Sequence, residues 1–206
     1  MKLALVGGGG HCRSCIDVAR SAGLPLGGIV DPAPEAQMLG LPRLGDDAWL
    51  ETPEARAFQY LVTVGQIDAS VVRRRLFDRL REKKLDCATM IAASAIVSTE
   101  AALGAGTIVM HRAVVNAGAV VGVNCIVNTG AIIEHDARIG DHCHVSTGAT
   151  VNGGATVGEG CMIGSGAIVL QGITIAAGVV VGAGAVITKN IGEAGTWIGV
   201  PARKTS

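Results

Sequence analysis

Aliphatic residues recur at every sixth position over the second half of the chain. They occupy sixteen successive positions: Val97, Leu103, Val109, Val115, Val121, Val127, Ile133, Ile139, Val145, Val151, Val157, Ile163, Val169, Ile175, Val181 and Ile187. The residue two places earlier is Ala, Cys or Thr in fourteen of these hexads. A period of six fits neither the repeat of a helix nor the alternation of a hairpin. The pattern predicts a hexapeptide β-solenoid, with three hexads per coil and the aliphatic residues pointing into the prism.

The first part of the chain has a different hydrophobic pattern. Apolar runs at residues 2–6, 26–31, 60–65 and 85–91 predict strands, while residues 11–22 and 69–84 have helical spacing. Strands that alternate with helices indicate a small parallel α/β sheet. We therefore expect an α/β domain over residues 1–90 and a solenoid domain with a C-terminal cap over residues 91–206.

Composition narrows the partners. Aromatic residues make up only 2% of the chain, which suits a prism too narrow for rings, and the formal net charge is +0. Nucleic-acid binding therefore lacks its usual basic footprint. The sequence has no uninterrupted apolar run long enough for a membrane span, and the 6 Cys are expected to be reduced thiols. We expect a cytoplasmic protein.

The cysteines are interpreted mainly as packing residues. Cys125, Cys143 and Cys161 are one coil apart at the small inward position, so they should form a ladder inside the prism. Cys12 and Cys15 form a lone C-x-x-C without the second pair that a zinc site needs.

A glycine-rich loop after the first strand is a candidate binding site. The run Gly7-Gly8-Gly9-Gly10 opens the first helix, where backbone N–H groups and the helix N-terminus favour phosphate, and Asp31 ends the second strand. A full dinucleotide domain does not fit in about 90 residues. A mononucleotide or nucleotide sugar is the better-sized ligand, and a simple tight turn is the alternative.

The histidines suggest acid–base chemistry more than metal binding. His135 lies between Glu134 and Asp136 at a hexad corner, where a carboxylate can orient one ring nitrogen and make the other a general base. A solvated edge residue is the alternative. His111 lies one coil and one face earlier, and His142 and His144 lie at other phases of the hexad, so a shared zinc site is not expected. We expect His142 to be solvated.

Together these residues resemble the NeuD/PglD-type family of sugar acetyltransferases. The motifs that carry the resemblance are Gly7-Gly8-Gly9-Gly10-His11, Asp31, Val64-Gly65, Asn128-Thr129-Gly130, Glu134-His135-Asp136, His142-Cys143-His144-Val145-Ser146 and Gly199-Val200-Pro201-Ala202. The resemblance implies a Rossmann-like domain followed by a left-handed parallel β-helix, although crossover connections are generally right-handed. It also implies homotrimers with active sites between subunits.

The resemblance also implies a set of site residues. The family's base falls on His135, its orienting acid on Asp136, and Asn128 lies near the same groove. His144 matches the contact to the thioester end of acetyl-CoA, and Gly153 offers a backbone N–H there. Further acetyl-CoA contacts are expected at Ser165, Gly182, Lys189, Pro201, Arg203 and Lys204. The nucleotide-sugar contacts are expected at Gly9, Gly10, His11, Asp31 and Gly65.

The implied reaction is acetyl transfer from acetyl-CoA to the amino group of a nucleotide-linked sugar, by direct attack and without a metal. A UDP-4-amino sugar of bacterial glycan synthesis is the expected acceptor. O-acetylation of a sialic acid, a metal-dependent hydratase on the same solenoid and a non-catalytic nucleotide-sugar scaffold are the alternatives. Cys12 and the pair Gln66-Ile67 depart from the family's usual residues, which leaves the identity of the nucleotide and the sugar open.

Overall fold

The chain begins with a Rossmann-like α/β unit. The computed structural model describes residues 1–33, 38–67 and 71–205. A parallel sheet has the strand order β3-β2-β1-β4-β5. Its elements are β1 (Lys2–Val6), α1 (Gly10–Ser21), β2 (Leu26–Val30), β3 (Arg43–Gly45), the 3-10 helices η1 (Asp47–Glu51) and η2 (Pro53–Ala57), β4 (Phe58–Val62), α2 (Val71–Glu82) and β5 (Asp86–Cys87).

Apolar residues of the sheet alternate between two covering layers. Leu3, Leu5 and Leu61 pack with α1, whereas Ala4 and Val6 point to the side covered by the 3-10 helices and α2. The predicted elements at 2–6, 11–22, 26–31 and 60–65 are confirmed to within a few residues. Residues 69 and 70 of the predicted second helix lie outside the described part of the chain.

One predicted strand is wrong. The apolar run 85–91 forms two strands in two sheets, because β5 pairs with β4 while β6 (Met90–Ile91) pairs with β9 of the solenoid. The break lies at Ala88 and Thr89, where the chain leaves one sheet and enters the other. The sequence also gave no signal for β3 or the 3-10 helices, which are too short to show a period.

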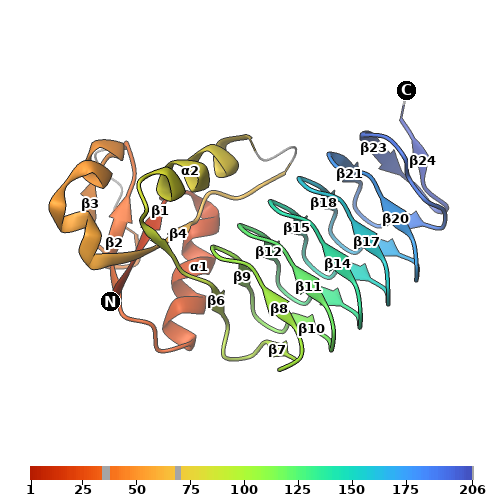
Figure 1. Cartoon of the computed structure of the whole chain (residues 1–206), viewed down its shortest axis with the longest axis horizontal. Coiled ribbons are helices and arrows are strands. Elements are labelled where there is room, and N and C mark those ends of the chain that lie inside the picture. Colours follow the sequence, from red (N-terminus) through yellow and green to blue (C-terminus); the bar gives the residue numbers. More distant parts are fainter. Residues whose placement is uncertain (34–37, 68–70, 206) are drawn as a thin grey trace.

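A parallel β-helix with three faces forms the rest of the molecule (Figure 1). Face 1 contains β6, β9 (Ile108–Val109), β12 (Ile126–Val127), β15 (His144–Val145), β18 (Met162–Ile163), β21 (Val179–Val181), β23 (Gly195–Ile198) and β24 (Arg203–Lys204). Face 2 contains β7 (Ile96–Val97), β10 (Val114–Val115), β13 (Ile132–Ile133), β16 (Thr150–Val151), β19 (Ile168–Val169) and β22 (Val186–Ile187). Face 3 contains β8 (Ala102–Leu103), β11 (Val120–Val121), β14 (Arg138–Ile139), β17 (Thr156–Val157) and β20 (Thr174–Ile175).

The inside of the β-helix is the hexad pattern made solid. Its aliphatic positions from 109 to 187 are buried, and Val97 and Leu103 at the open end are partly buried. Cys125, Cys143 and Cys161 are buried free thiols at the small inward position, as the ladder requires. The predicted fold class, an α/β domain followed by a parallel β-helix, is therefore confirmed.

The α/β unit sits on face 1. The outward side chains of its first three strands, Met90, Ile108 and Ile126, are buried in the same cluster as Leu5 and Ile16. The next outward position on this face is His144. Face 1 is thus partly covered, and the corner between faces 2 and 3 lies opposite the α/β unit.

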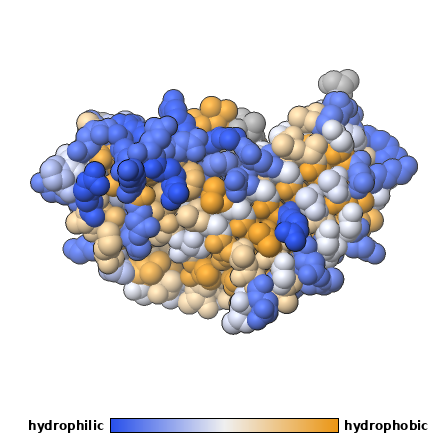
Figure 2. Space-filling view, in the orientation of Figure 1, coloured by the Kyte–Doolittle hydropathy of each residue, from blue (hydrophilic) through white to orange (hydrophobic). Residues whose placement is uncertain are grey.

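Side-chain character differs between the two parts of the molecule. Figure 2 shows hydrophilic residues gathered over the α/β unit and a band of hydrophobic residues along the β-helix. Neither α1 nor α2, the α-helices of the described residues, has the length and apolar character needed to cross a bilayer.

Candidate functional site

The glycine-rich loop lies at the edge of the sheet where nucleotides commonly bind. It follows β1 and reaches the N-terminus of α1, whose N-cap is Gly9. Strand order reverses between β1 and β4, so the loop borders the topological switch point. Gly7 has φ 103°, and a Cβ there would lie 2.5 Å from Val64 Cγ2, so glycine is required.

Asp31 organises this loop. One of its carboxylate oxygens accepts the Gly8 N–H at 2.6 Å, and the other accepts the Ala33 N–H at 2.8 Å. Charge-assisted bonds of this kind hold a loop in one conformation. Asp31 therefore shapes the binding loop, in addition to its predicted contact with a ribose.

His11 and Gly65 meet at the same edge. A Cβ on Gly65 would lie 3.4 Å from His11 Cβ, and His11 Nε2 is buried without a hydrogen-bond partner among the described residues. Burial, followed by the charge of Arg73, lowers the pKa of His11 to about 4. His11 is thus neutral at physiological pH.

His144 connects the β-helix to the α/β unit. Its Nδ1–H donates to the Gln66 carbonyl at 2.6 Å, and its Nε2 accepts from Asn128 Nδ2 at 3.0 Å. These two bonds define a neutral ring with the proton on Nδ1. Burial is the main cause that lowers the pKa of His144 to about 4, which agrees with that tautomer.

His135 and Asp136 form an exposed pair at the corner between faces 2 and 3. His135 Nδ1 donates to Asp136 Oδ2 at 2.9 Å, and this bond raises the pKa of His135. The other nitrogen, Nε2, lies over Gly153, where a Cβ would come within 2.6 Å of it. Glu134, Asn152, Gln171 and Gly172 line the shallow groove around the pair. The pair thus presents an unprotonated Nε2 to whatever binds in this groove.

The C-terminal cap forms a second pocket at the end of the prism. Lys189 and Arg203 line it together with Trp197. Lys189 is 54 residues after His135, so it lies three coils further along the same corner. Pro201 is exposed beside the cap, and Lys204 pairs with Glu193 at 2.8 Å. The predicted cationic cofactor contacts therefore gather at the cap, except that Lys204 already has a carboxylate partner.

The predicted site residues occupy separate places in one chain. His135, Gly153 and Lys189 lie on the corner between faces 2 and 3. Asn128, Ser165 and Gly182 lie on the corner between faces 1 and 2. Ser165 Oγ is 3.0 Å from Ser146 Oγ, and Gly182 packs against Ile198. The expectation that Asn128 and His135 share a groove is therefore not met within one chain.

The nucleotide candidates are also remote from His135. Gly9, Gly10, His11, Asp31 and Gly65 belong to the unit that covers face 1, and the His135 corner lies opposite that face. One chain alone therefore does not bring the predicted base to the predicted nucleotide loop.

The expectation that His142 is solvated is wrong. His142 is 5% exposed and lies edge-on to Phe77 of α2, with ring centroids 5.7 Å apart. Its burial lowers its pKa. The hexad phase placed His142 at a corner correctly, but it held no information about the helix that covers this corner.

Two further residues at the site were missed from the sequence. Gln66 supplies the carbonyl that holds His144, and Arg73 is buried beneath it. A charged residue on the apolar stripe of a helix was the available signal for Arg73. Within the described ranges, no group of three or more His, Cys, Asp or Glu residues is arranged to hold a metal ion.

Comparison with known proteins assigns the family. Residues 2–80 match the PglD N-terminal domain, and residues 154–189 match the bacterial transferase hexapeptide repeat. A comparison with curated proteins gave no match.

Solved structures resemble the chain over its whole length. One is perosamine N-acetyltransferase from Caulobacter crescentus in complex with CoA and GDP-perosamine, with 34% identity, a TM-score of 0.94 and coverage of 100% of this chain and 97% of that one. Another is the acetyltransferase domain of PglB from Neisseria gonorrhoeae FA1090, with 35% identity, a TM-score of 0.91 and 99% coverage of both chains. WeeI from Acinetobacter baumannii AYE, at 19% identity and a TM-score of 0.78, shares the fold. From its two matched domains and these full-length similarities, the chain belongs to the NeuD/PglD-type family of sugar acetyltransferases.

Proposed function

We propose that the protein transfers an acetyl group from acetyl-CoA to the amino group of a nucleotide-linked sugar. The observation that carries the proposal is the full-length similarity to perosamine N-acetyltransferase, a protein solved with both CoA and GDP-perosamine. The geometry adds an unprotonated histidine nitrogen in an open groove and a glycine-rich loop at a switch point. These are the groups that an amine acceptor and a nucleotide require.

His135 is the proposed general base. Asp136 fixes the ring with its proton on Nδ1, so the Nε2 lone pair is free to accept a proton from the attacking amine. As the N–C bond forms, the amine nitrogen loses its proton to Nε2, the C–S bond breaks and CoA leaves as the thiol. The carboxylate stabilises the imidazolium that results.

Backbone and buried groups would stabilise the thioester oxygen. The Gly153 N–H makes no main-chain hydrogen bond within the described residues, and it lies at the His135 corner. A preorganised N–H of this kind stabilises negative charge as it develops in the transition state. Asn128 and His144 are held by their mutual bond, which suits the proposed contact with the acetyl end of the cofactor.

A homotrimer would complete the site. Face 2 presents a row of outward aliphatic side chains, namely Ile96, Val114, Ile132, Ile168 and Val186. Exposed apolar rows of this length favour association with another surface. If three copies pack face 2 around a threefold axis, the corner between faces 2 and 3 of one copy meets the corner between faces 1 and 2 of the next.

This arrangement brings His135 of one subunit beside the groups that one chain keeps apart. Asn128, His144 and the α/β unit border face 1 of the neighbouring subunit. Lys189 and Arg203 at the cap are the proposed contacts for the CoA phosphates. The nucleotide itself is proposed to bind at residues 7–11 and Asp31, and its base stays open between uridine and guanosine.

A thiol-release assay tests the proposal. Acetyl-CoA is incubated with UDP- and GDP-linked amino sugars and with sialic acid, and the acetylated product is identified by mass spectrometry. We expect turnover of an amino-sugar nucleotide, and loss of turnover in His135→Ala with retained CoA binding. Acetylation of sialic acid alone would overturn the N-acetyl assignment, and near-normal rates in His135→Ala would overturn the assignment of the base.

A further inference from the structure

Arg73 is a buried cation at the boundary between the two parts of the molecule. It is 1% exposed, although neighbouring Arg74 and Arg75 on α2 are exposed. Burial lowers the pKa of Arg73 to about 10, so the side chain is still charged at physiological pH. A buried charge is costly unless its surroundings satisfy it, and its position therefore invites a functional explanation.

Three main-chain carbonyls receive the guanidinium. Arg73 Nη1 donates to the Val62 carbonyl at 2.6 Å and to the Val64 carbonyl at 3.0 Å. Nε donates to the Asn124 carbonyl at 3.2 Å, across the boundary on the β-helix. One side chain thus ties the end of β4 to a corner of the prism.

The backbone that Arg73 holds leads directly to His144. Val62 and Val64 precede Gln66 in the segment that crosses the switch point, and the Gln66 carbonyl accepts the His144 Nδ1–H. The position of that carbonyl decides which ring nitrogen of His144 carries the proton. The other nitrogen is then left to accept from Asn128.

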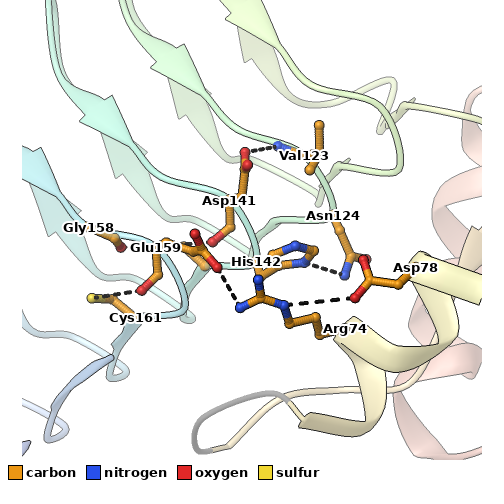
Figure 3. A network of polar contacts seen from close by, with 10 residues as sticks. Arg74, Asp78, Val123, Asn124, Asp141, His142, Gly158, Glu159 and Cys161 are labelled. Atoms are coloured by element: carbon orange, nitrogen blue, oxygen red, sulfur yellow. Dashed lines mark hydrogen bonds and ion pairs between the residues drawn. The ribbon is translucent and has the colours of Figure 1, made fainter. Parts of the chain in front are cut away.

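A set of contacts on α2 supports the same junction (Figure 3). Asn124 Nδ2 donates to His142 Nδ1 at 3.0 Å, and the His142 ring packs on Phe77. Arg74 also pairs with Glu159 at 2.5 Å. These contacts fix α2 on the corner between faces 3 and 1, so Arg73 projects from a rigid support.

We propose that Arg73 is a positioning residue for the transfer reaction, which holds the Val62–Gln66 backbone so that the Gln66 carbonyl fixes His144 in its Nδ1–H form. The proposal rests on the proposed function, because His144 acts there at the thioester end of acetyl-CoA. Its charge also disfavours protonation of His11 and His144, since Arg73 contributes to the lowered pKa of both rings.

The test compares Arg73→Lys and Arg73→Met with Arg75→Met, a matched change on an exposed position of the same helix. The tautomer of His144 is read from the nitrogen chemical shifts of its ring, and kcat and KM are measured with the amino-sugar nucleotide. We expect Arg73→Met to lose the pure Nδ1–H signature and to lose roughly 10- to 100-fold in kcat, as small displacements of a reacting group do. Arg73→Lys should recover part of both, and Arg75→Met should match the wild type.

The outcomes separate this proposal from the proposed function. If Arg73→Met does not fold, the folded Arg73→Lys variant decides the matter: an unchanged His144 spectrum and unchanged kcat overturn the proposal. A KM effect on the nucleotide sugar with unchanged kcat also overturns it. If the wild type acetylates no acceptor, the proposed function fails, while the His144 spectra still decide whether Arg73 sets the tautomer.

Discussion

Three histidines at the candidate site differ in charge because their surroundings differ. His135 is exposed and bonded to Asp136, which raises its pKa, whereas His11 and His144 are buried and have their pKa lowered to about 4. The exposed ring is suited to accept and release a proton, and the buried rings are suited to fixed hydrogen bonding. Environment therefore divides residues of one type into different proposed roles.

Replacing Asp136 should change the pH dependence of the reaction. The base acts in its neutral form, so the rate rises with pH through the pKa of His135. Because the bond to Asp136 is the main cause of the raised pKa, Asp136→Asn should move this limb of the kcat/KM profile to lower pH and lower the plateau about tenfold or more. Glu134→Gln is the control, since Glu134 is the weakest of the causes. An unmoved limb in Asp136→Asn would count against the pair.

The buried rings should make the protein sensitive to acid. Their pKa in the folded state lies below the value of 6.5 for a free ring, so the unfolded state binds more protons as pH falls from 6.5 to about 4. The free energy of unfolding should decrease through this window and level off below it, by roughly 3 kcal/mol for each ring. Urea unfolding at a series of pH values measures this slope. His144→Gln should flatten it, and an equal slope in the variant would refute the assignment.

At the scale of the element, the hexad decides which face or corner each side chain occupies. Each coil packs only on its neighbours, so a residue's phase in the repeat was enough to predict the core and the cysteine ladder. The same phase places Asn128 and His135 on successive corners, because seven residues exceed one hexad. The burial of His142 could not be predicted, since it depends on Phe77, which is distant in sequence. The division of residues 85–91 between two sheets likewise depends on strand pairing that no local period records.

Gly153 offers a test of the corner that carries the base. A Cβ at this position would collide with the His135 ring and with no other group within reach, and its backbone is outside the left-handed region. Gly153→Ala should therefore displace the ring and lower kcat about tenfold or more, with little loss of stability. Gly192→Ala, where no atom lies within 4 Å of the added methyl group, is the matched control. A folded Gly153→Ala variant with wild-type kcat would contradict the proposed position of the base.

At the scale of the whole molecule, the proposed site depends on two copies of the chain. The α/β unit is fixed to face 1, and His135 projects from the corner opposite that face. The described contacts between α2 and the prism, including the Arg74–Glu159 pair and the Phe77–His142 packing, hold the two parts together. The nucleotide loop and the proposed base can therefore meet only across a boundary between subunits.

Complementation between two inactive variants tests this account most directly. His135→Ala lacks the base, and Asp31→Ala lacks the carboxylate that holds the nucleotide loop. The two variants are co-expressed with different tags, mixed trimers are isolated through both tags, and acetyl transfer to the amino-sugar nucleotide is measured. In any mixed trimer one site in three combines an intact base with an intact loop, so we predict about one third of the wild-type activity. Mixed assemblies as inactive as either parent would contradict a site shared between subunits.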